Sequence, residues 1–172
     1  MKTLSLWQPW ASLIAAKVKA FETRSWAPPQ AYWPELIGGR IAIHASGRKI
    51  PQSPGSLSNW MAPITPEVEA KMVELLGLDW REAAPRGQVL CTARLAGVYQ
   101  VRDVAGVMWQ VGRSIPSSAG ISEFQPIDPW GDFTTGRWIW WLQDVRAVTP
   151  PAFAKGHQKL WNWTPPAQEQ AA

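Results

Sequence analysis

Two long strand patterns constrain the fold of this chain more than any other feature of its sequence. In residues 87–101, apolar side chains recur at every second position until the alternation shifts near Gly97, which predicts a strand with a β-bulge or bend. Residues 136–148 are rich in aromatic and β-branched residues on both alternating faces, and Pro150 and Pro151 are expected to end this strand. Because this second strand is apolar on both faces, we expect it to be buried on both sides.

The shorter elements decide how these strands can be connected. Four further strand patterns are short and lie at residues 3–6, 21–26, 40–45 and 156–163. Helices are expected to begin at Pro9 and to run from Thr65 to Leu76. A doubly wound parallel sheet would need a crossover helix after most strands, and the sequence does not provide them. We therefore expect an α+β fold: a small, partly closed β-barrel of about six mostly antiparallel strands with two to four peripheral helices.

The segments between these elements lack a regular apolar period. Residues 27–39, 47–66 and 102–133 are irregular, with Gly and Pro in each, and they are expected to be loops or surface excursions. The length of 172 residues suits a single core. We therefore expect one domain over residues 1–164, followed by a flexible tail over residues 165–172.

Charge and cysteine content limit the classes of function. The formal net charge of +4 permits binding to a polyanion but does not require it. The single cysteine, Cys91, excludes a disulfide within the chain and a cysteine-rich zinc site, and it fits a reducing cytoplasm. The sequence has neither the apolar run of a signal peptide nor about 18 consecutive apolar residues. We therefore expect a cytoplasmic protein without a membrane segment, resident metal or cofactor; dependence on a divalent metal stays open.

Tryptophan is unusually frequent, at 13 residues. Most of these side chains are expected to fill the core, because a buried indole contributes a large apolar area. A minority can instead line a cleft, where the flat ring stacks on nucleobases with about 1–3 kcal/mol each. The sequence therefore predicts both uses of tryptophan in one protein.

The stretch from Leu4 to Trp26 concentrates the polar chemistry. A short helix after Pro9 should be followed by a turn and a strand, which place Lys19, Glu22 and Arg24 close together. Because strand side chains alternate, Glu22 and Arg24 point to the same side. A carboxylate beside a guanidinium is either an internal ion pair or one half of a binding site.

Five sequence blocks together resemble the ASCH domain family (activating signal cointegrator homology), which belongs to the PUA-like superfamily of small β-barrels. The blocks are LSLWQPWASLIA at residues 4–15, KxxETRSW at 19–26, GRIAIHAS at 39–46, GDFTTGRWIWWLQDV at 131–145 and GxQxLW at 156–161. They extend over nearly the whole chain. The resemblance implies a cleft for RNA or a nucleoside-like ligand, in which Lys19 takes the place of the motif lysine and Arg24 that of the motif arginine.

The resemblance implies more than one activity, because the family is less uniform in function than in fold. Some small members resemble amidohydrolases that act on acylated cytidine, others are ribonucleases, and larger proteins use the domain to bind nucleic acid. Two positions depart from the family pattern. Lys17 stands where the family usually has Gly, and Glu22 stands where the amidohydrolase members have Thr. The second change removes a hydroxyl donor, which makes that amidohydrolase chemistry less favoured here.

Three roles are therefore open for the polar cluster. In the favoured one, Lys19 and Arg24 bind phosphate while Glu22 accepts a hydrogen bond from an exocyclic amine or a ribose hydroxyl. In the second, a hydrolase uses Lys19 as base or nucleophile, with Glu22 as its catalytic partner. In the third, an ion pair orders the turn, and the domain could bind a protein partner through exposed aromatic residues. The predicted ligand-binding residues are Trp7, Gln8, Trp10, Arg24, Ser25, Trp26, His44, Ser46, Arg137 and Gln158.

Overall fold

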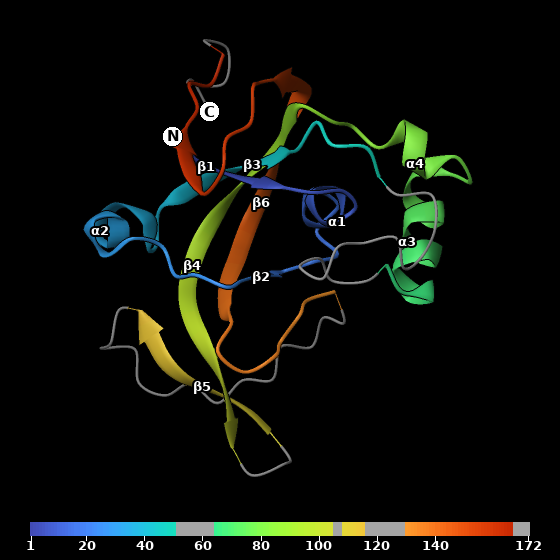
Figure 1. Ribbon diagram of the computed structural model, residues 1–172. Helices are drawn as coiled ribbons and strands as arrows, with labels where there is room; N and C mark the ends of the chain where they lie inside the picture. The colour runs from blue at the N-terminus through green and yellow to red at the C-terminus, as the bar shows by residue number, and fades with distance from the viewer. Residues whose placement is uncertain (51–63, 105–107, 116–129, 167–172) are drawn as a thin grey trace.

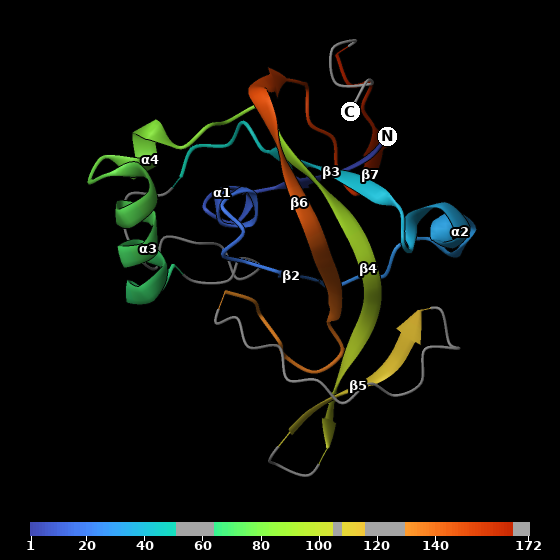
Figure 2. The ribbon, with the colours of Figure 1, turned by 180° about the vertical axis from the view of Figure 1, so that it is seen from behind.

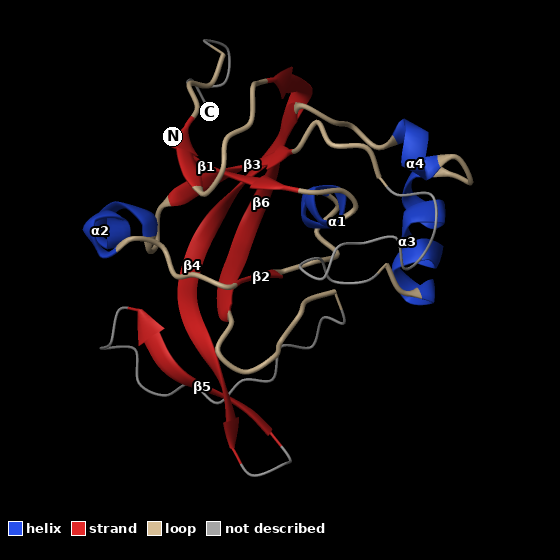
Figure 3. Ribbon diagram, in the orientation of Figure 1, coloured by secondary structure: helices blue, strands red, loops and turns tan. Residues whose placement is uncertain are grey.

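The structure is a computed structural model, and it describes residues 1–50, 64–104, 108–115 and 130–166. The strands within these ranges are β1 (Lys2–Leu6), β2 (Phe21–Arg24), β3 (Arg40–Ala45), β4 (Gln88–Val104), β5 (Met108–Ile115), β6 (Trp138–Phe153) and β7 (Leu160–Asn162). The helices are α1 (Trp10–Ala15), the 3₁₀ turn η1 (Gln30–Tyr32), α2 (Trp33–Leu36), α3 (Pro66–Leu76) and α4 (Trp80–Ala83). Figure 3 shows a strand-rich core with short helices at its periphery.

The strands form one sheet in the order β2-β6-β4-β3-β1-β7, with β5 paired to β4 (Figure 1). Strands β1 and β3 are parallel, and the other described pairs are antiparallel. The sheet curls into a half-barrel, so the expected α+β fold with mostly antiparallel strands is confirmed, with 7 strands in place of about six. The two outer strands, β2 and β7, do not pair with each other in the described part of the chain.

The long strands β4 and β6 pair from Gln88 opposite Phe153 to Gln100 opposite Trp138. The predicted irregularity near Gly97 is confirmed by a register shift between Leu95 and Gly97. The prediction that Pro150 and Pro151 end the second strand is wrong, because β6 continues to Phe153. The reason is a second register shift, between Val89 and Cys91, which places the prolines where the hydrogen-bonded ladder is interrupted.

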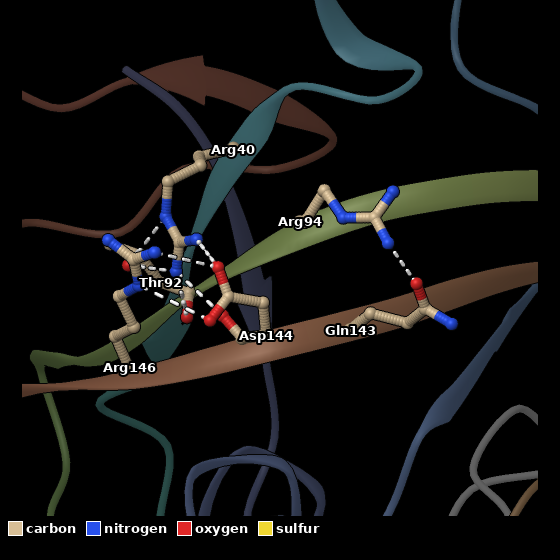
Figure 4. A network of polar contacts seen from close by, with 6 residues as sticks. All are labelled: Arg40, Thr92, Arg94, Gln143, Asp144 and Arg146. Carbon is tan, nitrogen blue, oxygen red and sulfur yellow. Dashed lines mark hydrogen bonds and ion pairs between the residues drawn. The ribbon is translucent and has the colours of Figure 1, made fainter.

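A third register shift in β6 is held by a polar network on the sheet (Figure 4). Asp144 has a φ of 46°, in the left-handed region that non-glycine residues rarely adopt. Its carboxylate accepts hydrogen bonds from Arg40 at 2.6 Å and from Arg146 at 2.9 Å. Arg40 also donates to the backbone oxygen of Asp144 at 2.8 Å. These charge-assisted contacts hold the unusual backbone of the bulge in place.

The helices occupy two sides of the barrel (Figures 1 and 2). One apolar cluster fills the barrel beneath α1, and a second joins α1 to α3 and α4 through Trp10, Leu13, Met72 and Trp80. Helix α3 matches its prediction, since the hydroxyl oxygen of Thr65 accepts the backbone N–H of Val68 at 3.4 Å. No helix in the described ranges is long and apolar enough to cross a membrane.

Several elements lie where the sequence predicted irregular structure. The turn η1 and helix α2 fall within residues 27–39, and β5 falls within residues 102–133. Helix α4 was not predicted either, and the contacts of Trp80 and Arg81 with Glu69 of α3 fix it in place. Of the predicted tail, residues 167–172 lie outside the described part of the chain.

Candidate functional site

A cleft of about 640 Å³ is lined by residues of β2, an outer strand of the described sheet, and by residues 156–159, which precede β7, the other outer strand. Ten of the predicted site residues line it: Trp7, Trp10, Lys19, Glu22, Arg24, Trp26, His44, Ser46, Arg137 and Gln158. Eight further lining residues were not predicted: Ser5, Leu6, Thr23, Gly47, Trp130, Gly156, His157 and Lys159. The structure thus brings together the ends of β1 and β3, the edge strand β2 and two distant loops.

Lys19 lines the cleft and is only 1% exposed. Its ammonium donates to the backbone oxygen of Phe21 and, at 3.0 Å, to that of Trp130, and it lies 3.6 Å from the carboxylate of Glu22. An ammonium has three N–H donors. Two of these donors bind backbone oxygens and the charge is paired with Glu22, which ties the α1–β2 turn to the loop that carries Trp130.

Two arginines line the cleft closer to solvent. Arg24 Nη2 donates to the backbone oxygen of Ser5 at 2.9 Å, and Arg24 Nε lies 3.1 Å from Glu22 in an ion pair that is not aligned as a hydrogen bond. This contact confirms that Glu22 and Arg24 point to the same side of β2. Arg137 donates to the backbone oxygen of Thr23 at 3.2 Å and pairs with Asp132, also at 3.2 Å. Both guanidinium side chains remain 25% exposed, so they can reach a ligand.

The charge of the cleft is predominantly positive. Among the described lining residues, Lys19, Arg24, Arg137 and Lys159 are cationic, whereas Glu22 is the one carboxylate. The carboxylate is only 7% exposed and is compensated by its two cationic neighbours. The lining therefore favours an anionic ligand over a cationic one.

Aromatic side chains form the other part of the lining. Trp7, Trp10, Trp26 and Trp130 all contribute to the cleft. The guanidinium of Arg48 stacks over Trp7 at 4.5 Å. Trp26 packs edge-on against the core residue Trp140, with ring centroids 5.2 Å apart. These contacts hold indole rings at the wall of a cationic cleft, where they can stack on a planar ligand.

His44 also lines the cleft and is fully buried. Its Nε2 lies 3.0 Å from the backbone oxygen of Ala154, and its Nδ1 lies 3.1 Å from Ser5 Oγ. Burial lowers the pKa of His44 below 6.5. The hydrogen bond that the imidazole donates to the backbone oxygen of Ala154 opposes this shift, and the nearby His157 adds to it. The imidazole is therefore neutral at pH 7.

Two predicted residues do not line the cleft. The amide of Gln8 is 2% exposed, donates to the backbone oxygen of Pro85 at 2.7 Å and accepts the backbone N–H of Ser12 at 3.1 Å. Gln8 thus fastens the start of α1 to the segment before β4. Ser25 is exposed just after β2 and is absent from the lining.

Lys17, which replaces the usual glycine of the family pattern, has a φ of 62°. This left-handed conformation follows the end of α1, and the backbone N–H of Lys17 donates to the carbonyl of Ile14 at 2.8 Å. Glycine adopts this conformation without steric cost, which explains why it suits this position. In this chain the turn keeps that geometry with a lysine.

The described residues contain no group of three or more His, Cys, Asp or Glu side chains that could hold a metal ion. Cys91 lies in the core, where burial raises the pKa of its thiol to about 12.

Comparison with known proteins places the chain in a family. The model of the ASCH domain matches residues 4–152. A search of curated protein sequences gives no significant match. Among solved structures, the crystal structure of ASCH from Zymomonas mobilis aligns with 17% sequence identity and a TM-score of 0.47, over 98% of this chain and 90% of that one. Because the family match runs from β1 into β6 and includes most of the chain, this protein belongs to the ASCH domain family.

Proposed function

We propose that this protein binds single-stranded RNA, or a nucleotide, in the cleft. The observation that carries the proposal is that four tryptophans and four cationic side chains line one cavity among the described residues. Cationic groups bind phosphates, and indole rings stack on bases with about 1–3 kcal/mol per base. The ASCH family also has a PUA-like fold that is often associated with nucleic-acid binding.

The contacts suggest a division of roles that differs from the sequence prediction. Lys19 is only 1% exposed, donates to two backbone oxygens and is ion-paired with Glu22, which makes it a poor phosphate ligand. Arg24 and Arg137 each carry five N–H donors, more than the two contacts that each makes with described residues. We therefore assign phosphate binding to these arginines and to Lys159, which is exposed.

Glu22 is the candidate base-reading group. Its carboxylate offers about four acceptor positions, and Lys19 and Arg24 each occupy one side of it. The remaining positions can accept hydrogen bonds from an exocyclic amine or a ribose hydroxyl. A carboxylate with two cationic neighbours stays compensated when it makes these bonds, so it does not repel the phosphate.

Fluorescence anisotropy with a short, fluorescein-labelled single-stranded RNA tests the proposal. Affinity should fall as salt rises, with a slope of about 0.7 in log Kd against log salt for each phosphate contact. Arg137→Ala should weaken binding and lower that slope by about 0.7. Trp7→Ala should weaken binding by about 1–3 kcal/mol if its ring stacks on a base.

The matched control is Arg146→Ala. Arg146 also pairs with an aspartate, but it lies in the network of Figure 4, its side chain is 61% exposed, and it does not line the cleft. The Arg146→Ala substitution removes the same charge from the protein as Arg137→Ala does. It should leave the dependence of RNA affinity on salt unchanged. Binding that is independent of salt, or equal losses in the two arginine variants, would refute the cleft as the RNA site.

The other two functions have less support from the geometry. A hydrolase that uses Lys19 as base or nucleophile needs a neutral amine, which would give up one of the three contacts of the ammonium. A protein-docking patch needs exposed apolar side chains that are contiguous. The two most exposed large apolar residues in the described ranges, Leu78 and Phe153, instead lie on separate elements, after α3 and at the end of β6.

A further inference from the structure

A chain of hydrogen bonds joins four residues, of which Ser5 and His44 line the cleft. Ser5 of β1 and His44 of β3 are register partners in the parallel strand pair. Trp161 Nε1–H donates to Ser5 Oγ at 3.0 Å, and Ser5 Oγ lies 3.1 Å from His44 Nδ1. His44 Nε2 lies 3.0 Å from the backbone oxygen of Ala154. A hydroxyl, an imidazole and an orienting carbonyl therefore lie in sequence.

The acceptor at Ala154 fixes the direction of these bonds. A backbone oxygen cannot donate, so the imidazole carries its proton on Nε2. Because the neutral ring then has a lone pair on Nδ1, Ser5 Oγ–H donates to it. This is the tautomer that a general base needs, and the base is oriented by a third group.

Access to the cleft differs between the two members of the pair. Both residues line the cleft, but Ser5 is half-buried whereas His44 is fully buried. Gly156 covers the imidazole so closely that an added Cβ would lie 2.8 Å from Nδ1 and 3.1 Å from Ser5 Oγ. Ser5 is thus the more exposed member of the pair, while Gly156 packs closely against both side chains.

A cation also stands beside this serine. Arg24 Nη2 donates to the backbone oxygen of Ser5 at 2.9 Å, and both residues line the cleft. A guanidinium in this place can stabilise negative charge that develops on the carbonyl oxygen of a substrate. The hydroxyl, the base and the electrophilic group that acyl transfer requires are therefore gathered in the cleft.

We propose that Ser5 and His44 act as nucleophile and general base in the cleavage of carboxylic esters, an activity beyond RNA binding. Ser5 Oγ attacks the carbonyl carbon while its proton passes to His44 Nδ1. The tetrahedral intermediate then expels the alcohol oxygen, which takes that proton and leaves an acylated Ser5. Water, deprotonated by Nδ1, attacks the acyl carbon, and Ser5 Oγ leaves and regains the proton. The products are an alcohol and a carboxylic acid.

The first experiment measures covalent labelling of the purified full chain with a fluorophosphonate probe. Intact-mass spectrometry should show one adduct per chain, and peptide mapping should place it on Ser5. Hydrolysis of p-nitrophenyl acetate should show a burst from the acylated serine. The acylation rate should be constant above pH 6.5 and should fall at lower pH, where His44 becomes protonated.

Variants show whether the hydrogen-bonded pair of Ser5 and His44 has a catalytic role or only a structural one. Ser5→Ala should abolish the adduct, and His44→Gln should slow labelling by about 100-fold or more. Thr164→Ala, which removes an exposed hydroxyl, should leave labelling unchanged. If His44→Gln does not fold, Ser5→Cys supplies the second test. Its new thiol should be alkylated by iodoacetamide faster than a free cysteine is. Cys91 should not interfere, because burial raises the pKa of its thiol to about 12.

The outcomes also distinguish this proposal from RNA binding. Ser5→Ala should lose labelling and ester hydrolysis while it keeps most of the affinity for RNA. A folded wild-type chain that forms no adduct, an adduct that persists in Ser5→Ala, or a slow thiol in Ser5→Cys would overturn the proposal and leave the binding result untouched. Loss of RNA binding with labelling retained would instead overturn the proposed function alone.

Discussion

The Lys19→Met substitution removes a buried ammonium but keeps an unbranched side chain of similar length. The ammonium is bound by the backbone oxygens of Phe21 and Trp130 and lies 3.6 Å from Glu22. Removing one partner of a buried ion pair costs about 3–5 kcal/mol, because the other charge stays buried. The contact between Glu22 and Arg24 at 3.1 Å compensates part of this cost. We therefore expect a loss of about 3 kcal/mol, at the lower end of that range.

Urea denaturation followed by circular dichroism measures this loss. For a chain of this length, about 3 kcal/mol corresponds to a decrease in Tm of roughly 6–12 °C. The matched control is Lys71→Met, which breaks an exposed ion pair with Glu74 and should cost less than about 0.5 kcal/mol. Glu22→Gln should lower the free energy of unfolding less in the Lys19→Met protein than in the wild type. In the double variant it removes the buried carboxylate that Lys19→Met leaves without its ammonium partner. A loss below about 1 kcal/mol at an unchanged m-value would refute the reasoning.

Four further outcomes follow from individual residues. Lys17→Gly should raise the free energy of unfolding by about 0.5–1 kcal/mol, since φ at this position is 62°; urea denaturation measures the change, and a loss of stability would contradict it. Glu69→Ala should lower the free energy of unfolding by about 2–3 kcal/mol, because Glu69 accepts hydrogen bonds from the indole N–H of Trp80 at 2.8 Å and from the guanidinium of Arg81. The control Glu74→Ala breaks an exposed ion pair and should lower it by less than about 0.5 kcal/mol in the same assay. Cys91 should resist iodoacetamide at mildly alkaline pH in the native protein and react in urea, because burial raises its pKa to about 12; equal rates in both states would exclude this. The pKa of His44 is lower in the folded than in the unfolded protein, so the unfolded chain binds more protons and stability should fall as pH decreases from 6.5 towards the folded pKa. The difference between wild type and His44→Asn at several pH values isolates this contribution, and a pH-independent difference would argue against it.

The extent to which the fold could be predicted depends on how local its determinants are. Strands β4 and β6 follow from their own alternation, and α3 follows from Thr65, Pro66 and Gly77 at its ends. Helix α4 has no comparable signal, because it depends on contacts of its side chains with Glu69 on α3. The continuation of β6 through its prolines depends on an interrupted ladder with β4, which no property of the prolines reveals.

The same distinction explains which site residues the sequence revealed. Lys19, Glu22 and Arg24 lie within six residues, so a turn followed by a strand is enough to bring them together. Trp130 reaches Lys19 from 111 positions away, in a segment without clear periodicity. Gly156 has no side chain to draw attention to it, and its role appears once its backbone is seen against the imidazole of the cleft.

The cations beside β2 also contact the outer edge of the described sheet. Leu142 N–H of β6 donates to the carbonyl of Ala20 at 2.8 Å, so the carbonyls of Phe21 and Thr23 alternate to the unpaired edge. Lys19 and Arg137 donate to these two groups. An edge strand with unused carbonyls would offer a template for pairing with another chain. Lys19 and Arg137 thereby cap two carbonyls at this edge of β2, so their replacement should promote aggregation.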